Sequence, residues 1–81
     1  MQIAVNTIIT LENNEKYVVL NETYYQEDKY FLVMGIDDNK EIISSKVAIF
    51  KEILDIDGVY IDKESDPQII IDLTKKFKEQ M

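Results

Sequence analysis

Carboxylates are the most frequent reactive side chains of this 81-residue chain, which holds 16 Asp and Glu, nine Lys and no His or Cys. The missing histidine removes the usual general base and metal ligand, and the missing cysteine removes the thiol nucleophile and the disulfide. Carboxylate pairs can perform acid–base chemistry, but with so many acids in so short a chain some pairs will meet by chance. The serines Ser44, Ser45 and Ser65 have no nearby base except Lys46, which would point to the opposite face of a strand. We therefore expect no enzyme and no cofactor.

Residues 55–66 (DIDGVYIDKESD) have the length and acidity of a calcium loop. An EF-hand loop needs glycine at its sixth position and an acid or amide at its fifth, whereas Gly58 is fourth and Val59 is fifth. The pair Asp57 and Gly58 between β-branched residues instead predicts a hairpin turn. Ser65 and Asp66 before Pro67 offer N-cap side chains and predict a helix start. We expect no metal site here.

The charge of the chain is strongly acidic, at −7, and all its basic residues are lysines. Nucleic-acid binders use clustered Lys and Arg against phosphates, so we expect no nucleic-acid partner and no attraction to anionic membranes. There is no signal-peptide pattern and no apolar run near the roughly 20 residues that cross a bilayer, which predicts a cytoplasmic protein. Residues 1–66 carry a net charge of −8 and residues 67–81 a net charge of +1.

Alternating apolar and β-branched residues predict an antiparallel sheet within a single domain, residues 1–81. Residues 41–54 also fit part of a helical stripe; we choose a strand from Ile42, with a break or bulge near Ser44 and Ser45. Gly35, late in an apolar strand, suggests a bulge or a close backbone approach. The predicted strands span residues 3–11, 16–24, 29–36, 42–54 and 59–62.

Four aromatic residues fall within residues 22–37, namely Tyr24, Tyr25, Tyr30 and Phe31. They could form a stacking surface for a ligand or pack across a hairpin whose turn is the break at residues 26–28. Stacking platforms for single-stranded nucleic acids also need basic grooves, which this chain lacks. We therefore favour packing, with residues 29–36 as a central strand that is apolar on both faces.

The C-terminal segment predicts a helix. Asp72 and Lys76 stand in the favourable acid-before-base order four residues apart. The fold class is thus α+β: an antiparallel sheet of four to five strands, as hairpins or a meander, with one C-terminal helix packed on one face and the other face solvated or paired with something. The apolar stripe of the helix consists of Ile69, Ile70, Leu73, Phe77 and Met81.

The polar side of this helix holds the one surface that we single out as an interaction site. Ile71 is apolar among polar neighbours, and Lys75 and Lys78 follow it at helical spacing. The competing interpretation is a solvated helix face whose lysines complement the helix dipole.

The whole chain resembles the YrzB-like small acidic proteins of Gram-positive bacteria, a family with a domain of unknown function. The resemblance rests on TLENNEKYVVLNETYYQEDKYFLVMGIDD, KVAIFK and SDPQIIIDLTKKFKEQM, and it covers residues 10–81. The hairpin of the family usually has glycine where Glu27 or Asp28 stands here. The resemblance implies no known activity and assigns no functional residues.

These observations predict a small interaction module that binds a protein partner or a second copy through its sheet face or a sheet edge. The alternative is an acidic mimic that occupies the nucleic-acid site of another protein. Ionic strength distinguishes them, because binding by charge mimicry weakens steeply with salt and edge pairing does not.

Overall fold

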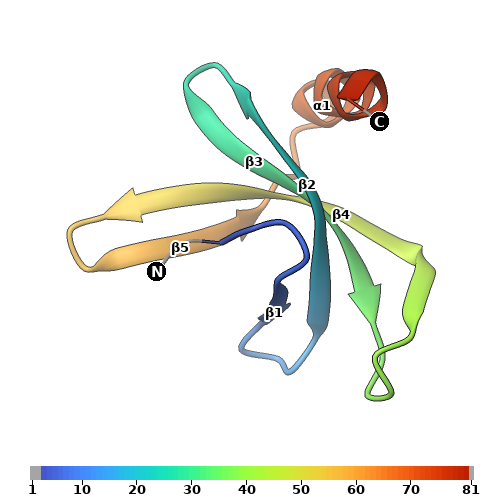
Figure 1. Cartoon of the computed structure of the whole chain (residues 1–81). Coiled ribbons are helices and arrows are strands. Elements are labelled where there is room, and N and C mark those ends of the chain that lie inside the picture. Colours follow the sequence, from blue (N-terminus) through green and yellow to red (C-terminus); the bar gives the residue numbers. More distant parts are fainter. Residues whose placement is uncertain (1–2, 81) are drawn as a thin grey trace.

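The computed structural model describes residues 3–80 as a five-stranded antiparallel sheet and one helix. The strand order β1-β2-β3-β4-β5 is a simple meander, which confirms the predicted α+β class and places β3 at the centre (Figure 1). The elements are β1 (Ile8–Thr10), β2 (Lys16–Tyr25), β3 (Asp28–Ile36), β4 (Ile42–Asp55), β5 (Gly58–Lys63) and α1 (Pro67–Gln80).

The first strand is much shorter than predicted, because residues 3–7 do not belong to β1. Asn6 has a φ of 73°, in the left-handed region that asparagine tolerates better than most residues. The Asn6 N–H donates to the Val19 carbonyl at 2.8 Å, and the chain turns there before β1 begins. Ile3 nevertheless remains buried, at 7% exposure. The alternating pattern was thus correct about the burial of Ile3 and wrong about Val5, which is 40% exposed, and about the extent of the strand.

The β2–β3 hairpin closes at the pair Tyr25 and Asp28, so its turn is Gln26 and Glu27, one residue shorter than predicted. Both residues have positive φ, 50° and 73°, as a type I′ turn requires. Of the aromatic residues near this turn, Tyr30 and Phe31 are buried, which confirms packing for them.

The β4–β5 hairpin was predicted at Asp57 and Gly58. Its central turn residues are instead Ile56 and Asp57, and Gly58 pairs with Asp55 as the first residue of β5. Gly58 has a φ of 142°, a conformation that a side chain would strain.

The predicted bulge in β4 is confirmed. Met34 pairs with Val47 and Gly35 with Ile43, so Ser44, Ser45 and Lys46 have no partners on β3. A Cβ atom on Gly35 would lie 2.6 Å from the Lys46 Cδ atom, which explains why glycine stands there.

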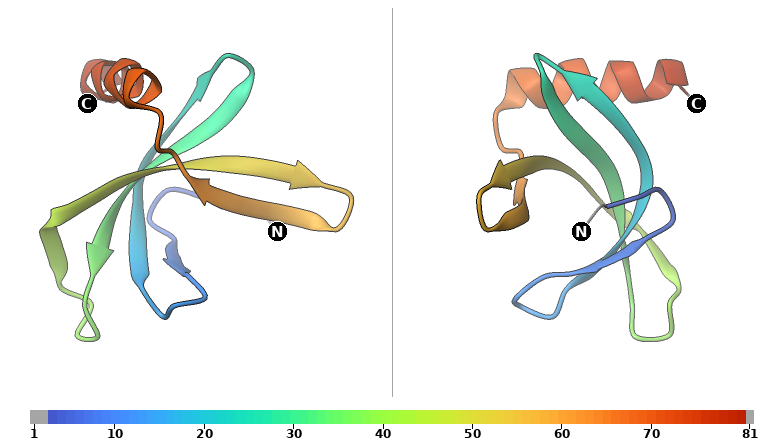
Figure 2. Two further views of the ribbon diagram at one scale, coloured as in Figure 1. Left: turned by 180° about the vertical axis from the view of Figure 1, so that it is seen from behind. Right: turned by 60° about the vertical axis from the view of Figure 1, so that its left-hand side comes forward.

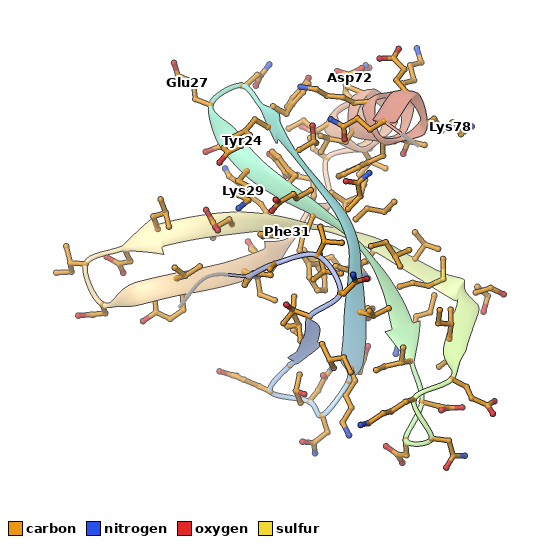
Figure 3. All side chains as sticks on the ribbon, viewed as in Figure 1. Tyr24, Glu27, Lys29, Phe31, Asp72 and Lys78 are labelled. Carbon is orange, nitrogen blue, oxygen red and sulfur yellow. The ribbon has the colours of Figure 1, made fainter. Side chains whose placement is uncertain are left out.

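The helix is capped as predicted, since the Gln68 N–H donates to the Asp66 carboxylate at 2.9 Å. The predicted pairing of Asp72 with Lys76 does not form. Asp72 instead accepts a hydrogen bond from the Tyr25 hydroxyl at 2.6 Å, and the Lys76 ammonium donates to the Tyr24 carbonyl. Both contacts tie α1 to the β2–β3 hairpin, and Figure 3 shows Asp72 on the helix and Glu27 at the tip of this hairpin.

The sheet bends into a half-barrel (Figures 1 and 2), and each of its faces has a separate apolar cluster. The helix covers one face. The other face was expected to be solvated or paired with something, but at its centre the sheet curls over its own side chains and buries them. The helix-side cluster is Tyr30, Ile49, Leu73 and Phe77; the half-barrel cluster is Ile3, Tyr17, Val19, Phe31, Val33, Ala48 and Phe50.

Candidate interaction site

The predicted surface on α1 lies on the exposed side of the helix. Ile71 is 50% exposed, and Lys75 and Lys78 are also exposed. Lys78 in addition lines a groove between the helix and the sheet, which Ile71 and Lys75 do not line. The structure therefore places the three residues along one helix and only Lys78 beside a hollow, so their role as an interaction surface stays a prediction.

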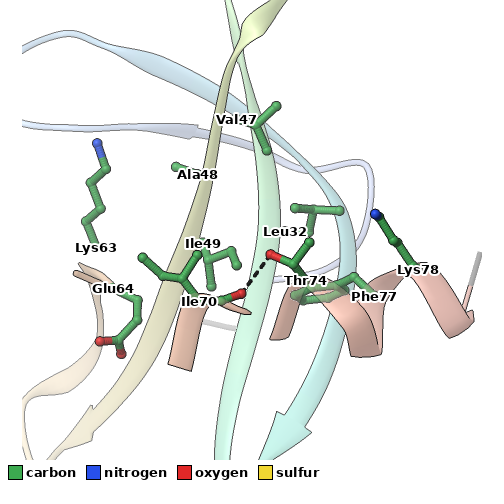
Figure 4. A pocket seen from close by; sticks show the side chains of 10 residues that line it. All are labelled: Leu32, Val47, Ala48, Ile49, Lys63, Glu64, Ile70, Thr74, Phe77 and Lys78. Atoms are coloured by element: carbon green, nitrogen blue, oxygen red, sulfur yellow. Dashed lines mark hydrogen bonds between the residues drawn. The ribbon is translucent and has the colours of Figure 1, made fainter. Parts of the chain in front are cut away.

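The groove beside Lys78 has a volume of about 300 Å³ and mostly apolar walls (Figure 4). Two of its four polar side chains, Glu64 and Thr74, are bonded within the chain. The Thr74 hydroxyl donates to the Ile70 carbonyl at 2.7 Å, and the Glu64 carboxylate accepts from the Tyr30 hydroxyl at 3.2 Å. Burial, with the Glu64 charge as a smaller cause, raises the pKa of Tyr30 to about 12. The polar side chains left in the groove to orient a ligand are thus Lys63 and Lys78.

A larger opening, of about 600 Å³, lies between the two edge strands, β1 and β5. We call it the β1–β5 seam. It gives access to the half-barrel cluster, and the four aliphatic residues packed at the border of this cluster are only partly buried, two on each side of the opening. These are Ile9 and Leu11 beside Val59 and Ile61, and the remaining lining residues are Ile3, Thr7, Ile8, Thr10, Glu12 and Tyr60.

The hydrogen bonds of β4 show which backbone groups of β5 face the seam. The Glu64 N–H donates to the Ile49 carbonyl at 2.9 Å, and these residues continue the β4–β5 register by one position. Hydrogen-bonded and non-bonded pairs alternate in an antiparallel ladder, so Gly58, Tyr60 and Asp62 direct their backbone groups to β4. The backbone groups of Val59, Ile61 and Lys63 therefore point to the open edge.

The same reasoning applies to β1. The Val19 N–H donates to the Thr7 carbonyl at 2.9 Å, and the Leu11 N–H donates to the Glu15 carbonyl at 2.8 Å. Both bonds fit the β1–β2 register, so Ile9 also bonds to β2, while Ile8 and Thr10 direct their backbone groups to the seam.

Two carboxylates lie at the seam or next to it. Glu12, just after β1, lines the opening, and Asp62 on β5 lines the adjoining hollow of about 320 Å³ beside the β1–β2 turn. Both side chains are exposed, and neither has an ion-pair partner among residues 3–80. Tyr60, on the same face of β5 as Asp62, is 51% exposed. The seam thus combines apolar walls, unpaired backbone groups and negative charge.

The seam was missed by the sequence reasoning, which expected an exposed edge without saying where. Its residues alternate apolar and polar as any strand with one buried face does, and the gap depends on how the sheet bends. The sequence carried one usable signal, because five strands in a meander leave two edges that run in the same direction.

Within the described residues, no three His, Cys, Asp or Glu side chains lie close enough together to hold a metal ion. No helix of residues 3–80 is long and apolar enough to cross a membrane.

Comparison with models of known protein families, with curated proteins and with solved structures finds no match to this chain. The resemblance to the YrzB-like proteins stays a prediction from the sequence. Function is therefore argued from the seam itself.

Proposed function

We propose that this protein is an interaction module that accepts one extended strand of a partner protein in the β1–β5 seam. The observation that carries the proposal is the opening of about 600 Å³ between two edge strands, with half-buried Ile9, Leu11, Val59 and Ile61 on its two sides. Edge strands with free backbone groups are templates for strand addition, and apolar pockets beside them provide specificity.

The direction of the edge strands supports a single inserted strand. Neighbouring strands of the meander are antiparallel, so β1 and β5, the first and last of five, have the same sense in the strand order. One strand of opposite direction is then antiparallel to both edges at once. Such a strand would turn the half-barrel into a closed barrel of six strands, which has no edges left to protect.

The backbone groups match the same arrangement. The residues of an inserted strand bond alternately to the left and to the right, so its inward-facing residues pair with one neighbour and its outward-facing residues with the other. On β5 the free groups belong to the inward-facing Val59 and Ile61, and on β1 they belong to Ile8 and Thr10, which alternate with the inward-facing Ile9. One strand can therefore satisfy both edges.

Burial adds to these hydrogen bonds. Covering the exposed half of a large aliphatic side chain contributes about 1 kcal/mol, so the four border residues together contribute about 4 kcal/mol before the cost of ordering the partner.

Proline at position 63 tests this proposal. Lys63→Pro removes an N–H that faces the seam and bonds nothing in the sheet, whereas Lys63→Ala removes the side chain and keeps this N–H. We expect wild type and Lys63→Ala to capture the same protein from an extract of the host, and Lys63→Pro to lose it. Equal capture by all three folded proteins would show that the edge is not the binding surface.

Mimicry of a nucleic acid is the second candidate, and the net charge of −8 on residues 1–66 favours it. The captured protein should then be a nucleic-acid binder that elutes at moderate salt, and Lys63→Pro should bind it as well as wild type does. A partner held by strand pairing should resist the same salt gradient.

A further inference from the structure

We infer that the strand accepted by the seam runs antiparallel to β5 and alternates apolar residues that face inward with lysine or arginine residues that face outward. This inference rests on the proposed function and adds the chemistry of the partner to it.

The inward-facing positions must be apolar because of what they would contact. They would lie over Val59 and Ile61 on one side and over Ile9 and Leu11 on the other, against the half-barrel cluster. A polar side chain at these positions would be buried among aliphatic groups without a hydrogen-bond partner. β-Branched residues fit best, because they pack well on a half-buried pleated surface.

The outward-facing positions meet negative charge. Asp62 and Glu12 are exposed beside the seam and lack ion-pair partners among residues 3–80, and no lysine lines the 600 Å³ opening. Lys63, at the end of β5, does not line this opening; it borders the hollow next to the β1–β2 turn and the groove between the helix and the sheet. A cation placed between the two carboxylates can also lie over the half-exposed ring of Tyr60.

The charge of the whole chain favours a basic partner over a second copy. Each protomer carries a net charge of −7, so two protomers repel each other on approach, whereas a basic strand is attracted. The β5 edge is itself net negative, since it is bordered by Asp57 and Asp62 with Lys63 as its only base.

Synthetic peptides of about seven residues, the length of a typical strand, test the inference. Three sequences share alternating valines and differ at the other positions, which are lysine, threonine or glutamate. We expect the valine–lysine peptide to bind at least about tenfold more tightly than the valine–threonine peptide, and the valine–glutamate peptide not to bind. Amide hydrogen exchange should then slow at Val59, Ile61 and Lys63, whose N–H groups face the seam.

Charge reversal at the seam provides the matched control. The double variant Glu12→Lys with Asp62→Lys should weaken binding of the valine–lysine peptide at least about tenfold and bind the valine–glutamate peptide instead. The variant Asp38→Lys with Glu41→Lys makes the same change of net charge on the exposed β3–β4 turn, and it should alter binding less than about threefold. Amide spectra establish that both variants keep the fold.

The outcomes separate this inference from the proposed function. If all three peptides bind equally and protect the Val59 and Ile61 amides, the seam accepts strands and the inference about charge is wrong. If no peptide protects these amides while Lys63→Pro still abolishes capture of a host protein, the inference fails and strand acceptance stands. If both tests are negative, both fail. Protection that grows with protein concentration alone would identify a second copy as the occupant and overturn the basic partner.

Discussion

The two faces of the sheet are closed by different means. On one face the helix α1 covers the cluster, and Leu73 and Phe77 are 0% and 1% exposed. On the other face the sheet bends over its own side chains, and Val33 at the centre is 0% exposed while Ile61 at the border is only partly buried. Residues 3–80 contain one helix, so one helix is available to cover a face of the sheet.

Under the proposed function, this difference decides where a partner can bind. Hydrogen bonds fix the helix to the sheet. The Tyr25 hydroxyl donates to Asp72, and the Gln80 side-chain amide donates to the Thr23 hydroxyl at 3.0 Å. The half-barrel side ends at two strands whose outer backbone groups have no partners among residues 3–80. Where a helix covers a face, residues of the same chain complete its packing. Where the sheet covers a face by bending over it, an unpaired edge strand remains on each side.

The largest effect is expected on the helix side. Phe77→Ala leaves a cavity between helix and sheet and should lower the free energy of unfolding by about 3–5 kcal/mol, most of what a domain of this size has. Urea denaturation followed by circular dichroism measures it. Ile71→Ala, on the exposed side of the same helix, should cost less than about 1 kcal/mol. If the two variants were equally stable, the helix would not be sealing that face.

The second prediction compares two isoleucines, one from each face. Ile49→Ala should lower the free energy of unfolding by about 2–5 kcal/mol, because Ile49 is buried under the helix at 7% exposure. Ile61→Ala at the seam should cost only about 1–2 kcal/mol, because its side chain is already half in water and solvent can fill the space. When wild type and Ile61→Ala are both saturated with the valine–lysine peptide, the difference between their free energies of unfolding should increase, because the bound peptide would bury Ile61. Equal costs without peptide would mean that the seam is closed.

The helix side was largely predictable from the sequence because its signals are local. Asp66 and Pro67 mark the helix start. The bulge was predicted near Ser44, which has no partner on β3. The hairpins were found from their polar breaks, with errors of one residue in each turn. Such features depend on residues that are neighbours along the chain.

The half-barrel side was less predictable, because its shape depends on residues far apart in the sequence. The alternation of apolar residues from Ile3 to Leu11 continues past Asn6. The positive φ of Asn6 turns the chain before β1, and the alternating pattern does not show this turn. The distance between β1 and β5 is set by the bend of all five strands. The predicted surface of Ile71, Lys75 and Lys78 was drawn from one helix and therefore took no account of the edges.

The third prediction concerns the hairpin that α1 contacts. Gln26 and Glu27 hold left-handed conformations that cost residues with side chains about 1 kcal/mol each. The double variant Gln26→Asn with Glu27→Gly should raise the free energy of unfolding by about 1–2 kcal/mol, because asparagine and glycine suit a type I′ turn. Thermal unfolding measures the gain. In the other hairpin, Gly58→Ala should act in the opposite direction, since its φ of 142° strains any side chain although no atom lies within 4 Å of an added Cβ.

The smallest effect is a change in pH dependence at the contact between the helix and the β2–β3 hairpin. The hydrogen bond from Tyr25, and to a lesser extent that from Gln68, holds the pKa of Asp72 below its usual value. A carboxyl with a lowered folded-state pKa contributes stability that is present above the unfolded-state pKa and is lost as the pH falls through the folded-state pKa.

Tyr25→Phe removes this hydrogen bond, so the variant should be less stable than wild type near neutral pH and should converge on it as Asp72 is protonated in acid. Urea midpoints measured between about pH 7 and pH 2 record the two slopes. Tyr24→Phe is the matched control, because Tyr24 is 63% exposed and contacts the helix through its carbonyl, which the variant retains. Parallel curves for Tyr25→Phe and wild type would mean that Asp72 does not fasten the helix. Under the proposed function the seam peptides should still bind Tyr25→Phe as tightly as wild type, because this contact lies on the opposite face of the sheet.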